Sequence, residues 1–384
     1  MTDIIKLFSG IGVIIDDEIN ISESSIRKVV SSFEEKHIPL LPYEELPSVE
    51  IVQNFHSVSF VLLDWKWNAK ASEDTLLADN LAFIAELHKV CFVPVFIFTD
   101  EEPRDIIALL EREKVYSEAK NNLIFVKHKT EVDTSEKLFS AINDWVKNTL
   151  PAYIIKEWDN KKRIASNSLF QSLYNINPNW VNIFLETSKK DSVDAAFELD
   201  ELLFENLHSQ MSLLNLNDLP IKHNEEISYE ATEIRDILQR QRFLPADKLL
   251  SEMIYTGDIY VMHDGEDEYY INVRPQCDCI PREGIELGDI VLYLIKGTEK
   301  PIDKCHFNKR DGNFSDIETR VTVFPINHKA IQFQLGEFSV RKFSEMRECR
   351  IGRLLPPYIT KLVQKYALYM RRQALPRIPE EATK

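Results

Sequence analysis

The sequence predicts an α/β doubly wound domain at the N-terminus, then a helical segment, then a small antiparallel β barrel or sheet with a C-terminal helix. The first domain is indicated by short apolar runs that alternate with amphipathic helical stripes between residues 10 and 150. Such runs are typical of parallel strands that are buried on both faces. The length of 384 residues leaves room for two or three domains, at about 100–200 residues each. We expect domains at 1–150, 151–250 and 251–384.

Five apolar runs are expected to be the strands of the first domain. They are residues 12–15, 38–41, 60–63, 93–98 and 123–126. Capping residues mark two of the helices between them, because Ser22 precedes the first helical stripe and Thr134 or Ser135 precedes the last. Pro151 follows the unit and is expected to mark its exit.

The rest of the chain changes character twice. Residues 151–250 carry helical stripes, whereas residues 251–384 are rich in strand patterns separated by turn residues such as Gly336. Pro356 and Pro357 open a final helical pattern. The strands of this last part are expected at residues 258–262, 269–273, 289–295, 317–324, 331–335 and 338–343.

Composition excludes several classes of protein. A formal net charge of −16 argues against a wholly basic nucleic-acid-binding protein. No apolar run approaches the roughly 18 residues of a membrane-spanning helix, so we expect no membrane partner. The first residues lack the pattern of a signal peptide, and the five cysteines do not suggest a disulfide framework, so a cytoplasmic location is expected. Neither a P-loop nor a dinucleotide-binding glycine pattern occurs.

Polar residues follow four of the predicted strands of the first domain. The first strand ends in Asp16 and Asp17, the third in Asp64, the fourth in Thr99 and the fifth in Lys127. Ligands of open α/β sheets bind at the carboxyl ends of the strands. These side chains are therefore expected to lie close together.

This set of residue types fits the transfer of a phosphoryl group to a carboxylate. Three carboxylates can hold Mg²⁺, a hard cation that prefers oxygen ligands, and the metal offsets charge on the phosphoryl oxygens. Asp64 would be the nucleophile and phosphoacceptor. Lys127 would pair with the incoming phosphoryl group, and Thr99 would hydrogen-bond to it after transfer.

The ordered set VIIDDE, FVLLD, FIFT and FVK resembles the receiver domain of two-component response regulators, over roughly residues 10–150. The resemblance implies a flavodoxin-like fold, with Mg²⁺ bound by Asp16, Asp17, Asp64 and the backbone carbonyl of Lys66. It also implies that Asp64 takes its phosphoryl group from a histidine kinase or a phosphotransfer protein. Thr99 and Lys127 would then form the switch.

Several features depart from the receiver pattern, among them Ile124 where an aromatic switch residue is common and a long loop after Asp64. His128 stands where receivers usually have a proline after the lysine, and Asp100 stands where a small residue is usual. A carboxylate at position 100 is expected to crowd the phosphoryl group and to slow both its uptake and its hydrolysis. These departures leave open a phosphorylation-independent pseudo-receiver that acts as a protein-binding scaffold. An ordinary flavodoxin-like domain with solvated loop acids is the plainer alternative.

The C-terminal region contains no familiar DNA-binding module. Arg371 and Arg372 belong to a basic terminal stretch, which leaves a nucleic-acid-binding response regulator as an alternative. We favour instead a solvated basic face on a surface helix, and thus no nucleic-acid partner. His208, a lone histidine on a predicted helix, is interpreted as structural rather than as a phosphotransfer residue.

Four soft donors allow a zinc site to be considered: Cys277, Cys279, Cys305 and His306. The C-x-C spacing is unusual for structural zinc, and no second spaced pair occurs. Cysteines that pack in the core are the preferred explanation.

The sequence as a whole predicts a signalling protein, either a regulator or a phosphate sink in a phosphorelay. The stretch GRLLPPYITKLVQKYALYMRRQALPRIP, with TGDIYVM and RPQCDC upstream, is similar to a module that uncharacterised bacterial proteins attach to a receiver. Some of those receivers resemble regulators of phage-defence phosphorelays. We expect no enzymatic activity beyond self-phosphorylation and autodephosphorylation of the receiver. Receiver faces often pair, so a homodimer is left open.

Overall fold

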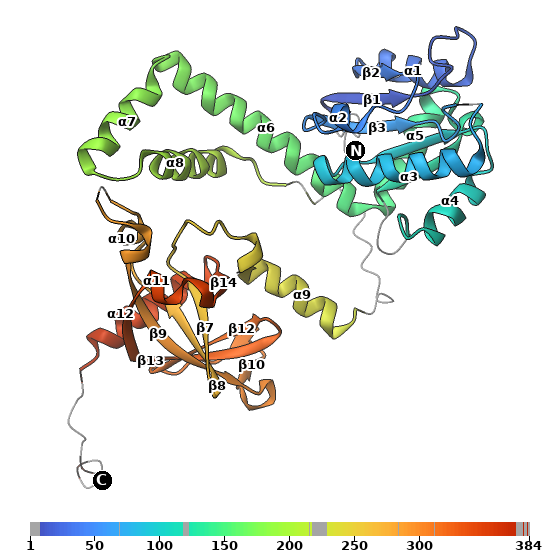
Figure 1. Cartoon of the computed structure of the whole chain (residues 1–384). Helices are drawn as coiled ribbons and strands as arrows, with labels where there is room; N and C mark the ends of the chain where they lie inside the picture. The colour runs from blue at the N-terminus through green and yellow to red at the C-terminus, as the bar shows by residue number, and fades with distance from the viewer. Residues whose placement is uncertain are drawn as a thin grey trace. The chain divides into compact units, whose positions relative to one another are not determined.

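The computed structural model describes residues 8–68, 70–117, 123–214, 216, 229–282, 284–310, 312–373, 379 and 382. The chain forms two compact units, one of Met1–Ile176 with Glu205–His223 and one of Asn177–Phe204 with Asn224–Lys384. The boundaries expected near residues 150 and 250 do not coincide with this division, because the segment 151–176 belongs to the first unit. Figure 1 shows the elements of both units along the chain.

The first unit is built on a five-stranded sheet in the order β2-β1-β3-β4-β5. All of its strand pairs are parallel. This sheet and its helices form the α/β doubly wound fold that the sequence predicts. The strands are β1 (Ile11–Ile15), β2 (Leu40–Tyr43), β3 (Val58–Leu63), β4 (Val95–Thr99) and β5 (Ile124–His128).

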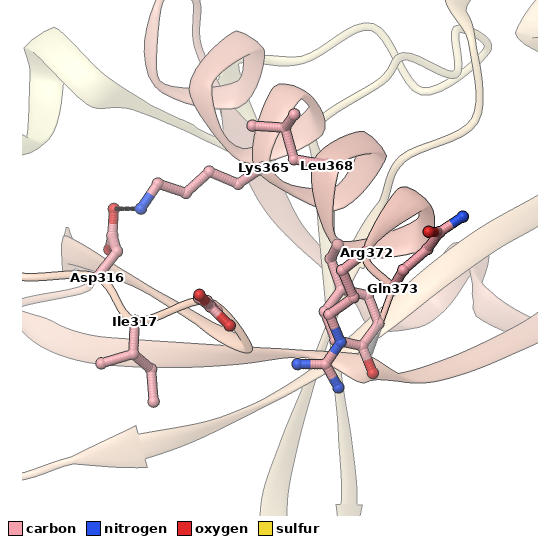
Figure 2. A pocket seen from close by; sticks show the side chains of 8 residues that line it. Asp316, Ile317, Lys365, Leu368, Arg372 and Gln373 are labelled. Carbon is pink, nitrogen blue, oxygen red and sulfur yellow. Dashed lines mark ion pairs between the residues drawn. The ribbon is translucent and has the colours of Figure 1, made fainter. Parts of the chain in front are cut away.

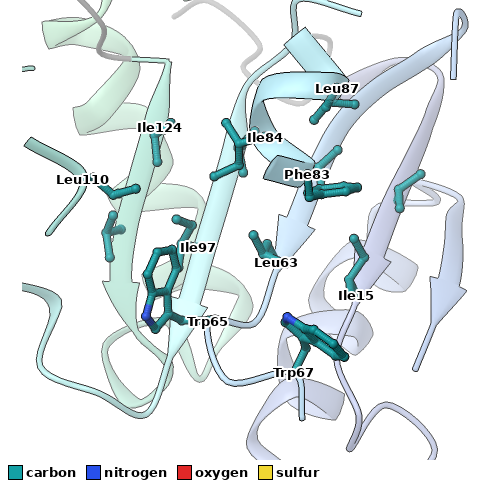
Figure 3. Close-up of a cluster of buried hydrophobic side chains, with 14 of the residues drawn as sticks. Ile15, Leu63, Trp65, Trp67, Phe83, Ile84, Leu87, Ile97, Leu110 and Ile124 are labelled. Carbon is teal, nitrogen blue, oxygen red and sulfur yellow. The ribbon is translucent and has the colours of Figure 1, made fainter. Parts of the chain in front are cut away.

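Helices cover both faces of this sheet. Helices α1 (Ser25–Glu35) and α5 (Ser135–Asn148) bury their apolar side chains on the face that carries Phe60 and Phe96. Helices α2 (Val49–Val52), α3 (Glu73–Val90) and α4 (Pro103–Arg112) pack on the opposite face, part of which is drawn in Figure 3. The strands are buried on both sides, and this is why their sequences are continuous apolar runs.

Hydroxyl side chains cap the helices at the positions where the chain leaves the loops. The Oγ atoms of Ser24 and Ser72 accept hydrogen bonds from the third helical N–H of α1 and α3, at 3.3 Å and 3.2 Å. Thr134 caps α5 in the same way, at 3.3 Å, as the sequence predicts. The first helix begins two residues after the position that Ser22 indicated, since its cap is Ser24.

Four further helices follow the α/β domain. Pro151 does not end the first unit: it is the second residue of α6, where its missing N–H costs no intrahelical hydrogen bond. These helices are α6 (Leu150–Ile176), α7 (Trp180–Asp191), α8 (Ala195–Gln210) and α9 (Ala231–Arg242). They fall within the segment that the sequence predicts to be helical.

The second unit contains a curled antiparallel sheet of seven strands, in the order β12-β13-β9-β8-β7-β14-β6. Its long strands are β7 (Asp258–Asp264), β8 (Glu266–Asn272), β9 (Val291–Lys300), β12 (Arg320–Ile326) and β13 (Lys329–Lys342). Helix α12 (Tyr358–Arg371) packs on one core of this sheet through Ile359 and Leu362. The expected antiparallel sheet with a C-terminal helix is consistent with this arrangement.

The remaining elements of the second unit are short. They are β6 (Phe243–Pro245), β10 (Phe307–Asn308), β11 (Asn313–Phe314), β14 (Arg350–Leu354), α10 (Gln276–Cys279), α11 (Phe343–Met346), η3 (Ala246–Lys248), η4 (Leu287–Asp289), η5 (Ile302–Lys304) and η6 (Arg347–Cys349).

The turn predicted at Gly336 is instead an irregularity within the strand β13. The sequence places a turn at Gly336 between two strands, but β13 continues through it and its pairing with β9 shifts register between Phe333 and Phe338. A Cβ atom at Gly336 would lie 2.7 Å from the Tyr369 hydroxyl oxygen. The glycine therefore permits the close approach of α12.

Among the described residues, no helix combines the length and the apolarity that a membrane span requires.

Candidate functional site

The parallel ladder of the first unit brings two acidic strand ends together. The N–H of Asp64 donates to the carbonyl of Ile15 at 2.9 Å, and the N–H of Asp16 donates to the carbonyl of Tyr43 at 3.0 Å. Asp16 and Asp64 thus leave neighbouring strands at the same level. Together with Asp17 they form an acidic cluster in which one ligand oxygen of each residue lies within 4.8 Å of the others.

The three carboxylates differ in burial. Asp16 is fully buried, Asp64 is 6% exposed, and Asp17 lies at the surface. Backbone groups orient the two buried ones: the N–H of Glu18 donates to Asp16 Oδ1 at 2.8 Å, and the N–H of Lys66 approaches Asp64 Oδ1 at 3.4 Å. The acidic cluster therefore has two fixed members and one that solvent reaches.

Lys129 completes this cluster. Its side chain is only 1% exposed, and its Nζ lies 2.9 Å from Asp16 Oδ2 and 3.2 Å from Asp64 Oδ2. Lys129 begins the 3₁₀ turn η2 (Lys129–Val132), whose Val132 is buried in the core. The turn carries the ammonium group back over the end of the sheet.

Lys127, which the sequence places in this role, lies elsewhere. Its Nζ pairs with Glu131 Oε2 at 3.0 Å, and its side chain is 35% exposed. The apolar run of β5 stops at Val126, but the strand continues to His128. Because β5 is an edge strand, its last residues are only half-buried and can be polar. The expectation for Lys127 is therefore corrected: Lys129 is the lysine beside the acids.

Thr99 ends β4, which lies between the strand that precedes Asp64 and the strand that leads to Lys129. Thr99 is fully buried, and its Oγ1 accepts a hydrogen bond from the N–H of Glu101 at 3.0 Å. Asp100 Oδ2 lies 3.4 Å from Lys129 Nζ, although the Asp100 side chain is 59% exposed. The Lys66 side chain forms an ion pair with Glu101. This pair links the loop after β3 to the loop after β4.

His128 precedes the lysine of the site rather than following it. Its Nδ1 accepts from the N–H of Thr130 at 3.2 Å and caps η2. Its Nε2 lies 3.2 Å from the backbone carbonyl oxygen of Asp100. The imidazole therefore connects β5 to the loop that carries Asp100.

The loop that follows Asp64 is anchored by two buried tryptophans. Trp67 Nε1 donates to Asn80 Oδ1 at 3.1 Å, and Asn80 Nδ2 donates to the carbonyl of Trp65 at 2.9 Å. Both indole rings belong to the apolar cluster beneath the site, with Trp67 near Ile15 in Figure 3. The anchor fixes the backbone of Lys66, which lies between the two tryptophans.

Burial and pairing act on the charges of this site in opposite directions. Burial raises the pKa of Asp64 to about 7, although the nearby Lys129 acts to lower it. Burial also raises the pKa of Asp16. For Lys129, burial opposes the charged form, but Asp64 and Asp16 outweigh it and raise the pKa of the ammonium group. The site thus holds more carboxylates than Lys129 alone can neutralise.

The donor set fits a magnesium ion. Asp16, Asp17 and Asp64 offer carboxylate oxygens from two adjacent strand ends, and hard divalent cations prefer such ligands. An exposed member leaves the cluster open to solvent. The backbone carbonyl of Lys66 remains a proposed fourth ligand.

The zinc alternative gains no support within the part of the chain that the structure describes. The one group of acidic, cysteine or histidine side chains found close enough to hold a metal there is the acidic cluster. Cys279 is buried whereas Cys277 is exposed. His208 lies at an exposed position of α8.

A separate pocket of about 830 Å³ lies in the second unit, between α12 and the segment before β12 (Figure 2). Lys361 and Lys365 each lie 2.9 Å from Asp316 Oδ2, and their hydrogen bonds lower the pKa of Asp316 despite its burial. Arg372 lies over the ring of Tyr369 at 4.6 Å. Asp316, Lys365 and Arg372 of this pocket are thus already partnered.

Comparisons of the chain with protein-family models, with curated proteins and with solved structures find no match. The parallel sheet and the acidic cluster are compatible with a receiver-like fold.

Proposed function

We propose that the first unit is a receiver that accepts a phosphoryl group on Asp64 from a histidine kinase or a phosphotransfer protein. One observation carries the proposal: Asp16, Asp17 and Asp64 meet Lys129 at the carboxyl edge of a parallel sheet. The strand order 2-1-3-4-5 supports it, because this is the order of flavodoxin-like sheets.

Each residue of the site has a role that follows from its position. A carboxylate oxygen of Asp64 attacks phosphorus while the bond from phosphorus to the donor breaks, so that an aspartyl phosphate forms and the donor leaves. Lys129 offsets the added negative charge on the phosphoryl oxygens. The Thr99 hydroxyl lies on the neighbouring strand and can turn from Glu101 to the phosphoryl group.

Asp16, Asp17 and Asp64 would hold Mg²⁺ in this proposal. The bound cation would neutralise charge on the carboxylates and on the transferred group.

Mass spectrometry of the intact chain tests the proposal. After incubation with acetyl phosphate and Mg²⁺, the wild type is expected to gain the mass of one phosphoryl group, and Asp64→Asn is expected to gain none. Asp144→Asn, which removes an exposed carboxylate of α5, serves as the control and should gain one group. Equal gain by wild type and Asp64→Asn would assign the chemistry to another residue.

A phosphorylation-independent scaffold is the second candidate function, and one observation favours it. Lys129 already has three carboxylate neighbours, because Asp100 joins Asp16 and Asp64. The scaffold predicts no Mg²⁺-dependent change with a phosphoryl donor. Isothermal titration with Mg²⁺ on the same sample tests it further: an acidic cluster that binds no Mg²⁺ would favour the scaffold, whereas Mg²⁺ binding without phosphorylation would point to a strict need for the cognate kinase.

The lifetime of the aspartyl phosphate distinguishes the two signalling roles. A short lifetime would favour a phosphate sink that drains a phosphorelay, with phage defence as part of the same proposal, and a long one would favour a lasting switch. The second unit would be the regulatory or protein-binding module, and size-exclusion chromatography with and without phosphoryl donor would show whether a homodimer forms.

A further inference from the structure

Asp100 is the most distant and the most exposed of the three carboxylates that surround Lys129. The ammonium nitrogen lies 2.9 Å from Asp16, 3.2 Å from Asp64 and 3.4 Å from Asp100. Asp16 and Asp64 are held by the sheet and by backbone N–H groups, whereas the Asp100 side chain is 59% exposed. Of the three carboxylates, Asp100 is the longest contact and the one that can turn into solvent.

An added phosphoryl group would compete with this carboxylate. An ammonium group has three N–H donors, and Lys129 has three carboxylate neighbours to receive them. A phosphoryl group on Asp64 carries roughly one and a half to two negative charges, in place of the single charge of the carboxylate. Repulsion between like charges then favours departure of the neighbour that water can solvate most easily.

We propose that Asp100 is a displaceable counter-ion of Lys129, which occupies the lysine until a phosphoryl group on Asp64 replaces it. This inference rests on the proposed function and adds its regulation. In the resting chain, Asp100 slows phosphorylation because its ion pair with Lys129 must break. In the phosphorylated chain, the released carboxylate turns outward.

The exchange of counter-ions would move a defined segment. The Asp100 carbonyl lies 3.2 Å from His128 Nε2, and the next residue, Glu101, pairs with Lys66 and donates to Thr99. Helix α4 begins two residues later, at Pro103. Departure of Asp100 from Lys129 therefore acts on the loop that links the site to α4.

The rate of phosphorylation tests the inference. Acetyl phosphate transfers its phosphoryl group to Asp64 as the bond to acetate breaks, and acetate leaves. Asp100→Asn keeps the shape of the side chain and removes its charge, so its initial rate should exceed the wild-type rate by about two- to fivefold, the range of an exposed ion pair. Asp105→Asn removes an exposed carboxylate from the first turn of α4 and should match the wild type.

The outcomes separate this inference from the function on which it rests. A wild type that is phosphorylated at the same rate as Asp100→Asn would overturn the inference and leave the receiver chemistry standing. A phosphoryl group on Asp100→Asn and none on the wild type would support both. If no chain is phosphorylated on Asp64, both are wrong.

Hydrogen exchange gives a readout that does not depend on the rate. Phosphorylation of the wild type should speed amide exchange in the peptide that spans residues 99–105, since the contact of Asp100 with Lys129 is lost. Asp100→Asn should already exchange faster there before phosphorylation. Unchanged exchange of this peptide in the phosphorylated wild type would contradict the displacement of Asp100.

Discussion

At the scale of single residues, the site is one ammonium group among several carboxylates. Lys129 is as deeply buried as the acids that it neutralises, and its turn is fixed by a buried valine and by the cap from His128. Removal of one partner of a buried ion pair leaves the other uncompensated, which commonly costs about 3–5 kcal/mol. Lys129 is thus tied both to the chemistry of the site and to the stability of the first unit.

Two lysines of similar chemistry allow a matched comparison. Lys129→Met should slow the uptake of a phosphoryl group from acetyl phosphate on the order of 100-fold, because the charge that stabilises the transferred group is lost. Lys127→Met should stay near the wild-type rate, because Lys127 pairs with Glu131 at the surface. Lys129→Arg keeps the positive charge, so it tests whether the loss of rate in Lys129→Met comes from the missing charge or from a change in folding. The reverse ranking of the two lysines would contradict the site as described.

Lys156 is a second buried lysine, and it has no carboxylate among its hydrogen-bond partners. It is 4% exposed, and its Nζ donates to the backbone oxygen and the hydroxyl of Ser59 at 2.6 Å and 2.7 Å. Burial lowers the pKa of Lys156 to about 8, and Asp159 offsets only part of this effect. Lys156 has its usual pKa, near 10.4, in the unfolded chain.

This difference in pKa predicts a pH dependence of stability. Between about pH 8 and pH 10.4 the unfolded chain binds a proton at Lys156 that the folded chain has lost, so this group makes folding more favourable as pH rises. The gain is up to about 3 kcal/mol. The free energy of unfolding can be measured in urea for the wild type and for Lys156→Met at pH 7.5 and at pH 10. From pH 7.5 to pH 10, the wild type should gain stability relative to Lys156→Met. A difference that does not change with pH would contradict the prediction.

At the scale of elements, the beginning of the loop after β3 is anchored to α3 by buried side chains. Trp65, Trp67 and Asn80 connect it to α3 inside the apolar cluster. The backbone of Lys66 is consequently fixed before any ligand arrives. A preorganised loop of this kind lowers the entropy cost of holding an ion.

Asn80 offers a direct test of this anchor. Asn80→Ala leaves the indole N–H of Trp67 and the carbonyl of Trp65 unpaired in the core, which should lower the free energy of unfolding by about 2–4 kcal/mol. It should also weaken Mg²⁺ binding to the folded chain. Asp79→Ala, at the preceding exposed position of α3, serves as the control in urea unfolding and in the Mg²⁺ titration. An Asn80→Ala chain as stable as the control would contradict the role of the anchor.

The strands of the first unit could be predicted from sequence because burial on both faces imposes continuous apolar runs. The rule that a strand ends where its apolar run ends does not hold for the edge strand β5. A run that stops at Val126 predicts that β5 stops there and that Lys127 is the lysine of the site, but an edge strand can continue with polar residues, and β5 extends to His128. The positions of Asp16 and Asp64 can be predicted from the sequence, because both residues directly follow fully buried strands. The contact between Asp100 and Lys129 depends on how two loops pack, and no local pattern encodes that.

At the scale of the whole molecule, the two units have separate apolar cores. Strands and helices of the α/β domain enclose two clusters, and the antiparallel sheet encloses two others. In the second unit, the buried Asp258 carboxylate pairs with Arg353 at 2.6 Å and with Arg350 at 3.3 Å. Each unit thus carries its own buried ionic group.

Separate cores predict separate unfolding transitions. In calorimetry, Mg²⁺ should raise the midpoint temperature of the unfolding transition of the first unit alone. A ligand that binds the folded state stabilises it by about 2.7 kcal/mol at 100 times its Kd. Asp258→Ala should lower only the midpoint of the unfolding transition of the second unit, because it leaves the partly buried Arg350 and Arg353 without their carboxylate. If Mg²⁺ and Asp258→Ala shift one common transition, the two units unfold together and the prediction is wrong.

Peptide mapping shows whether Asp64 is the residue that receives the phosphoryl group. Borohydride reduces an aspartyl phosphate to homoserine, which marks the modified position in a tryptic digest. After treatment of the wild type with acetyl phosphate and Mg²⁺, homoserine is expected at position 64 alone, and none is expected when Mg²⁺ is removed with chelator. Homoserine at Asp16, Asp17 or Asp100, or in no peptide at all, would contradict the assignment of the phosphoryl group to Asp64.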